Sequence, residues 1–284
     1  MDRRGFLSAA GLAALGAVAG CSDYPDQAEE PPMRQSQDLV SYGDDPNQVA
    51  ELYLPDGKPR GVVVVIHGGF WKAQYDRSLG QPLSADLASR GWAAWNLEYR
   101  RVGSDGSGQG GGAPETLDDV AAGIDALAGV EGLDLTRVVA LGHSAGGHLA
   151  AWAASRGRFE QWPVRVPVTG VIAQAGVLDL RAAYDLGLGG GAVERFLGHP
   201  PGPGDDPVDP IRQVPLDVPL WCVHATDDDV VPVSQSRDYV AAATAAGGWA
   251  DLVEVSGDHF TVVDPASDAW ARTVEILADS TRRG

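Results

Sequence analysis

The stretch from Arg137 to Ser155 reads RVVALGHSAGGHLAAWAAS. The apolar, partly β-branched run of residues 138–141 favours a strand, and the alanine-rich run of residues 145–155 favours a helix. Between them lies Gly142-His143-Ser144-Ala145-Gly146, where the glycines permit a turn too sharp for larger side chains. The stretch therefore predicts a strand, a tight turn and a helix, with the hydroxyl of Ser144 exposed at the turn.

Short β-rich runs alternate with helical ones on both sides of this stretch. The clearest strand is residues 61–66, whose unbroken β-branched run predicts burial on both faces. Further strands are expected at 92–97, 170–173, 218–224 and 251–255, and helices near 78–90, 114–128, 233–246 and 265–277. This alternation predicts an α/β fold with a mostly parallel central sheet and helices on both faces. We expect one domain over 39–284, with a Gly- and Pro-rich lid or insertion at about 178–217.

Composition fits a globular protein and argues against one class of partner. Apolar residues make up 44% of the 284-residue chain, and 39 acidic against 21 basic residues give a formal charge of −18. Such a charge repels phosphate backbones, so we expect no nucleic acid partner.

The first residues have the character of an export signal. Arg3-Arg4 precedes an apolar, Ala- and Gly-rich run that ends at Val18-Ala19-Gly20-Cys21, which resembles the lipobox of bacterial lipoproteins. The resemblance implies a signal peptide over 1–20, twin-arginine export, a lipid on Cys21 that anchors the protein to the outer face of the cell membrane, and a flexible tether over 21–38. An uncleaved signal anchor, or a cleaved peptide with an incidental cysteine, remains the alternative.

A nucleophilic serine needs a base, and the base needs a group that orients it. In the order serine, acid, histidine, His259 is the histidine that follows an acidic loop. That loop, residues 224–232, contains three consecutive aspartates, and Asp227 and Asp229 could serve as turn residues. A wholly structural loop is the alternative. His143 and His148 are interpreted as residues that pack beside the catalytic residues or support them, and His199 as a lid or loop residue.

The loop after the strand at 61–66 reads His67-Gly68-Gly69-Phe70-Trp71. Its glycines let backbone amides face a substrate oxygen, so we expect an oxyanion hole built from Gly68, Gly69 and Ala145. Amides of Gly69 or its neighbour and of Ala145 would donate, and Gly68 would shape the turn. His67 is expected to fix the loop. A plain Gly-Gly break after the strand is the alternative.

These motifs resemble those of bacterial α/β-hydrolases related to esterases and kynurenine formamidases, over about residues 45–280. The segments at 67–71 and 142–148 match H-G-G-x-W and G-H-S-A-G-G-H. The acid loop is also similar to the H-G-x-x-D-x-x-V-P of prolyl-oligopeptidase-like enzymes, which places the acid at Asp228, although Ala225 replaces the usual glycine. Residues 98–101 (EYRR) match a tyrosine–arginine stretch of the group, expected to anchor a loop.

The sequence thus predicts a serine hydrolase that cleaves a carboxylic ester or related amide of a small acyl substrate through an acyl-enzyme, with Ser144, Asp228 and His259 as catalytic residues and with no metal or organic cofactor. An arylformamidase-like or small peptidase activity is an alternative within enzymes. A surface-tethered, non-catalytic binding lipoprotein is the alternative from another class. The oligomeric state and the acyl group stay open.

Overall fold

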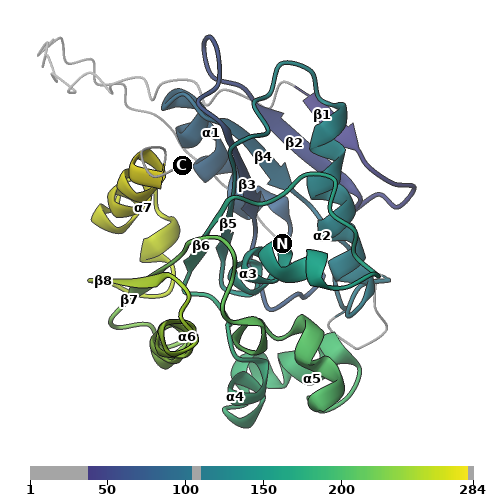
Figure 1. Cartoon of the computed structure of the whole chain (residues 1–284), viewed down its shortest axis with the longest axis vertical. Helices are drawn as coiled ribbons and strands as arrows, with labels where there is room; N and C mark the ends of the chain where they lie inside the picture. The colour runs from purple at the N-terminus through teal and green to yellow at the C-terminus, as the bar shows by residue number, and fades with distance from the viewer. Residues whose placement is uncertain (1–37, 104–109, 281–284) are drawn as a thin grey trace, which may run out of the picture. The chain divides into compact units, whose positions relative to one another are not determined.

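A computed structural model describes residues 38–103 and 110–280, and within them an eight-stranded sheet is covered by helices (Figure 1). Its strand order is β1-β2-β4-β3-β5-β6-β7-β8. The strands are β1 (Asp38–Ser41), β2 (Val49–Tyr53), β3 (Val62–Ile66), β4 (Ala93–Leu97), β5 (Val138–His143), β6 (Gly170–Gln174), β7 (Leu220–Ala225) and β8 (Ala250–Val255). Cys21, the predicted signal peptide and most of the predicted tether lie outside the described residues.

Alternation along β3 shows how the two faces of the sheet are covered. Val62, Val64 and Ile66 pack in one apolar cluster with α2, α3 and α6, whereas Val63 and Val65 pack in a second cluster with α1 and α7. Because successive side chains of a strand point to opposite faces, an unbroken apolar run needs helices on both. The helices are α1 (Gln81–Ser89), α2 (Glu115–Asp125), α3 (Ala145–Ser155), α6 (Ser234–Ala245) and α7 (Asp268–Ser280).

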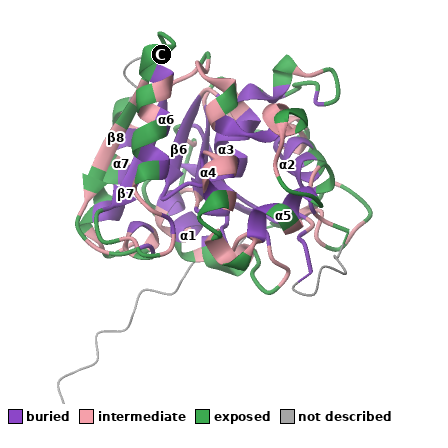
Figure 2. Cartoon of the chain, turned by 90° about the horizontal axis from the view of Figure 1, so that it is seen from below, coloured by how far each residue is buried: buried purple, intermediate pink, exposed green. Residues whose placement is uncertain are grey.

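The strands from β4 to β8 are parallel, as predicted, so their carboxyl ends share one edge of the sheet. Figure 2 shows the strands as buried ribbons between helices that carry exposed residues on their outer sides. Strand register sets β3 beside β5, with Ile66 opposite Gly142. The loop that follows β3 therefore begins next to the turn that carries Ser144.

Two antiparallel strands, β1 and β2, extend the sheet beyond β4 and were not predicted. β1 is four residues long and mostly exposed, so it carries no buried alternation for a sequence pattern to show. The predicted tether is one residue too long, because Asp38 already pairs with Leu52 of β2.

Residues 178–217, the predicted lid or insertion, connect β6 to β7. They contain two short helices, α4 (Leu180–Asp185) and α5 (Ala192–Leu197), with one 3-10 helix before α5 and two after it. The Ile211 amide donates to the Leu178 carbonyl at 2.9 Å, so the segment returns close to where it leaves the sheet. We call residues 178–217 the insertion; its action as a lid stays a prediction.

Two predicted helices begin later than expected. The helix predicted from residue 78 is a 3-10 turn, η1 (Arg77–Gly80), followed by α1. The helix predicted from residue 265 begins at Asp268, because the Asp264 and Ser267 side chains bind backbone amides and hold a turn first.

No helix among the described residues has the length and apolar character that a membrane span requires.

Candidate active site

Ser144 lies at the sharp turn between β5 and α3. Its backbone has φ 55° and ψ −118°, a conformation that non-glycine residues rarely adopt, and its amide donates to the Gln174 carbonyl at 2.8 Å. A Cβ on Gly142 would lie 2.0 Å from the Gly146 carbonyl oxygen, and one on Gly146 would lie 2.0 Å from that of Ile66. The two glycines are thus required by the close packing that holds Ser144 in this strained position.

Asp228 and His259 meet beside this turn. The Nδ1 of His259 lies 2.7 Å from Oδ2 of Asp228, and both side chains are almost completely buried. The amides of Val230 and Val231 donate to the other oxygen of Asp228, Oδ1, at 2.9 and 2.8 Å. Asp227 and Asp229 are exposed, so of the three aspartates it is Asp228 that contacts the histidine.

These donors keep Asp228 ionised. Burial alone would raise the pKa of its carboxyl, but hydrogen bonds from His224, His259 and the Val231 amide outweigh burial and hold the pKa well below its usual range. A carboxylate that stays charged can hold the Nδ1–H of His259, which leaves Nε2 of that ring to act as a base.

His143 connects the loop after β8, which carries His259, to the turn that carries Ser144. Its Nε2 donates to the backbone carbonyl of His259 at 2.9 Å, and the centres of the two rings are 4.5 Å apart. Burial and the nearby His259 lower the pKa of His143 to about 3, so this ring is neutral at neutral pH. Gln174 adds a second tie, because its side-chain amide donates to the carbonyl of Val262 at 2.5 Å.

The loop after β3 packs its glycines against the serine. A Cβ on Gly68 would lie 3.1 Å from Cβ of Ser144 and 2.8 Å from the His143 carbonyl oxygen. Gly69 has φ +107°, and a Cβ there would meet the ring of Tyr75 at 2.5 Å. Ala145 is the first residue of α3, where backbone amides lack helical partners. Backbone from both sides of Ser144 can therefore supply donors to an oxygen.

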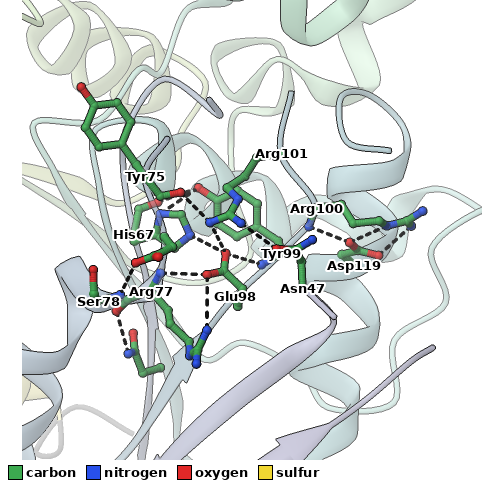
Figure 3. A network of polar contacts seen from close by, with 12 residues as sticks. Asn47, His67, Tyr75, Arg77, Ser78, Glu98, Tyr99, Arg100, Arg101 and Asp119 are labelled. Atoms are coloured by element: carbon green, nitrogen blue, oxygen red, sulfur yellow. Dashed lines mark hydrogen bonds and ion pairs between the residues drawn. The ribbon is translucent and has the colours of Figure 1, made fainter. Parts of the chain in front are cut away.

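A buried network of charged and aromatic side chains supports this loop (Figure 3). Nε2 of His67 lies 3.0 Å from Oε1 of Glu98, and the His67 ring stacks on Tyr99, whose hydroxyl donates to the His67 carbonyl at 2.8 Å. Arg101 lies 3.1 Å from the same Glu98 oxygen, and the Arg77 amide donates to the other. His67 and the stretch at 98–101 thus hold the loop, as the sequence predicted.

This network also keeps Glu98 charged. Burial would raise the pKa of Glu98, but His67 and Arg101 outweigh it, so that the pKa is lowered. Arg100, which precedes Arg101, turns away to Asp119 on α2 and pairs with it at 2.7 Å. The two arginines therefore anchor two different elements.

His148 and His199, the other histidines considered from the sequence, have partners other than Asp228. His148 is buried, and its ring packs edge-on against the rings of Trp71 and Phe196. Its Nε2 lies 2.9 Å from the Val208 carbonyl oxygen. Burial lowers the pKa of His148 to about 4, as suits a packing residue. His199 is exposed in the insertion.

His224 is the residue that sequence reasoning missed. It is fully buried at the end of β7, and its Nε2 lies 3.2 Å from Oδ2 of Asp228. The signal was present, since His224 precedes Asp228 by four residues in the acid loop.

Exposed apolar side chains surround the turn. Tyr75, Leu79 and Phe260 are 39%, 49% and 64% exposed, and Leu79 and Phe260 line a hollow of about 70 Å³ that includes Gly68 and His143. A larger cavity of about 680 Å³ lies at the opposite edge of the sheet, around residues before β5, β6, β7 and β8, and is not part of this site.

Residues 50–242, more than half of the chain, match the BD-FAE family model. The chain belongs to the BD-FAE family. Curated relatives include Esterase LipC of Mycobacterium tuberculosis, 27% identical over 86% of this chain and 65% of that protein. Isoprenylcysteine alpha-carbonyl methylesterase ICME of Arabidopsis thaliana is 27% identical over 80% of this chain and 57% of its own length. The chain thus spans less than two thirds of the length of these relatives.

Solved structures share the family's fold. A truncated carbohydrate esterase from gut microbiota matches with a TM-score of 0.72 at 19% identity, over 86% of this chain and 95% of that one. Esterase B from Lactobacillus rhamnosis, inhibited by a tributyrin phosphonate, also gives 0.72, at 22% identity over 88% and 87% of the two chains. With the strand order above, this likeness establishes the α/β-hydrolase fold.

Proposed function

We propose that this protein is a serine hydrolase that cleaves carboxylic esters, with Ser144 as nucleophile, His259 as base and Asp228 as the residue that orients the base. The observation that carries the proposal is the 2.7 Å hydrogen bond between Asp228 and His259, beside a serine held at positive φ. The hydrogen bond from His143 to the His259 carbonyl supports it further, because it fixes the histidine against the serine turn.

In the proposed mechanism Ser144 Oγ attacks the ester carbonyl carbon while Nε2 of His259 accepts the hydroxyl proton. The carbonyl oxygen becomes an oxyanion, and the amides of Gly69 and Ala145 donate to it, with Gly68 allowing the close approach. The imidazolium then protonates the leaving alcohol, and an acyl-enzyme remains. Water, deprotonated by His259, hydrolyses that ester and restores Ser144.

An ester is favoured over an amide by the curated relatives, both of which are named as esterases. The exposed apolar side chains of Tyr75, Leu79 and Phe260 support a small acyl substrate with an apolar part. Because the segment at 67–71 resembles that of kynurenine formamidases, N-formylkynurenine belongs beside p-nitrophenyl esters in the substrate panel.

Labelling with a fluorophosphonate tests the proposal. Purified protein is expected to react, and Ser144→Ala is expected to lose the label and to lower ester hydrolysis by about 10⁴-fold or more. Ser89→Ala, at an exposed serine that ends α1, is the matched control and should keep both. Label that persists in Ser144→Ala would contradict Ser144 as the nucleophile. No label in the unaltered protein would contradict the proposal and favour a non-catalytic binding lipoprotein.

We also propose that the protein is exported by the twin-arginine route and anchored by lipid on Cys21 to the outer face of the membrane. The support is the Arg3-Arg4 pair and the Val18-Ala19-Gly20-Cys21 motif. Palmitate incorporation into the full chain should be lost in Cys21→Ala and kept in Cys222→Ala, whose cysteine is buried in the fold. Equal incorporation in both variants would refute the anchor.

A further inference from the structure

Asp228 contacts a second histidine, His224, at the end of β7. Oδ2 of Asp228 lies 2.7 Å from Nδ1 of His259 and 3.2 Å from Nε2 of His224. The other oxygen of Asp228 accepts from two backbone amides. The carboxylate is therefore surrounded by four N–H groups, of which His224 supplies one.

The partners of His224 fix its tautomer. Its Nε2 faces two acceptors, the Val231 carbonyl oxygen at 2.9 Å and the Asp228 carboxylate, so Nε2 must carry a hydrogen. Its Nδ1 lies 2.7 Å from Oγ of Ser236 on α6, a buried hydroxyl that can donate. The ring is thus satisfied with Ser236 donating to Nδ1 and with Nε2–H donating to the Val231 carbonyl oxygen, 3.2 Å from the Asp228 carboxylate.

Two titratable groups near His224, Cys222 and His143, are uncharged at neutral pH. Burial raises the pKa of the Cys222 thiol, which lies beside Ser236, to about 12, and the pKa of His143 is lowered to about 3. His259 contacts Asp228 from the loop after β8, and Asp227 and Asp229 are exposed on the acid loop. At neutral pH the charge that His224 faces is therefore that of Asp228.

We propose that His224, oriented by Ser236, is a positioning residue of this site: its Nε2–H, shared between the Val231 carbonyl and the Asp228 carboxylate, holds this carboxylate in place so that it can orient His259. The proposal rests on the proposed function, because it assigns His224 a role in the same reaction. Without this donor the negative charge of Asp228 is less stabilised, so the Asp228–His259 pair binds a proton more readily. The acid limb of the kcat/KM pH profile must then move to higher pH.

Two substitutions separate this role from simple packing. In His224→Gln the side-chain nitrogen reaches about as far as Nε2, so the donor to Asp228 is kept. In His224→Asn the nitrogen reaches only as far as Nδ1, so that donor is lost. We expect the acid limb for a p-nitrophenyl ester to rise by about 0.5–1 pH unit in His224→Asn, with kcat about tenfold lower, and to stay in place in His224→Gln.

Ser236→Ala provides a second test if His224→Asn does not fold. Without the hydroxyl, Nδ1 loses its partner and the Nε2–H tautomer is no longer enforced, so the acid limb should rise by a smaller amount. An unchanged limb in Ser236→Ala and in every folded His224 variant would overturn the proposal.

A spectroscopic measurement needs no turnover. The downfield proton NMR signal of the hydrogen bond from His259 to Asp228 should persist in His224→Gln and shift or vanish in His224→Asn at equal melting temperature. An identical signal in both would overturn the proposal. If the unaltered protein shows no Ser144-dependent hydrolysis, the proposed function fails instead, whatever the NMR signal does.

Discussion

The loop after β3 and the loop after β7 reach the same edge of the sheet, but they are held by different kinds of contact. The β3 loop, residues 67–71, is held by side chains from elsewhere in the chain, chiefly Glu98 and Arg101. In the β7 loop Asp228 is held by the amides two and three residues after it and by the histidine four residues before it. The first support is assembled by the fold, and the second is local.

The difference follows from what each loop contributes. The β3 loop would bind an oxyanion with backbone amides, so side chains must hold its backbone. The β7 loop contributes one side chain, so backbone amides hold that side chain. The backbone of the β3 loop is thus supported by the buried Glu98 carboxylate, and the Asp228 carboxylate is supported by backbone amides of its own loop.

The largest effect on kcat is expected from replacing Asp228, the side chain that the β7 loop contributes. In Asp228→Asn the amide NH2 cannot accept from His259 as a carboxylate does, so the ring loses its orientation and kcat should fall by about 10⁴-fold. Ester hydrolysis at saturating substrate measures it. Asp227→Asn, at an exposed neighbour, is the matched control and should keep full activity. A loss below tenfold in Asp228→Asn would show that another group orients His259.

Replacing Glu98, which supports the β3 loop, should affect stability as well as the rate of hydrolysis. Glu98→Gln leaves the Arg101 guanidinium buried without its counter-charge, so the free energy of unfolding should fall by about 3 kcal/mol. Urea unfolding followed by tryptophan fluorescence measures it. Glu254→Gln removes an exposed pair with Arg237 and should cost less than about 1 kcal/mol. Equal losses in the two variants would mean that the buried network does not stabilise the loop.

The smallest effect concerns His143, which lies against Gly68 of the β3 loop and donates to the carbonyl of His259 in the loop after β8. The folded state holds its pKa near 3, below the ordinary value of 6.5, so His143 contributes stability that is present above pH 6.5 and lost as the pH falls toward 3. The loss is about 1.4 kcal/mol per pH unit. Unfolding between pH 7 and 4.5 should therefore depend less steeply on pH in His143→Gln.

His199→Gln, at an exposed histidine, is the control and should keep the original slope. Some slope should remain in His143→Gln, because the pKa of His148 is lowered in the same direction. A slope unchanged by His143→Gln would mean that this ring accepts a proton freely in the folded state.

The same contrast explains what the sequence could predict. The strand, turn and helix around Ser144 were predicted because the glycines at 142 and 146 are required locally, as their close contacts show. The acid was placed at Asp228 by resemblance to a local motif, and the structure brings this aspartate to His259. That placement and the catalytic roles stay predictions until the variants are measured.

Features that depend on distant contacts were not predicted. The edge strand β1 is mostly exposed and pairs through its backbone, which leaves little trace in side-chain pattern. The short helices of the insertion are bounded by glycines and prolines, so no periodic run is long enough to show them. The role of His224 depends on Ser236, twelve residues along the chain on another element.

The insertion between β6 and β7 is closed at its base, where the Ile211 amide donates to the Leu178 carbonyl. A segment closed at its base can lengthen or shorten at small entropic cost, because closure entropy grows slowly with loop length. Changes in this segment must keep its contact with the β3 loop, where Phe196 stacks on Trp71 at 4.5 Å. Exchange of residues 180–210 between relatives is therefore a direct test of whether the insertion sets substrate preference.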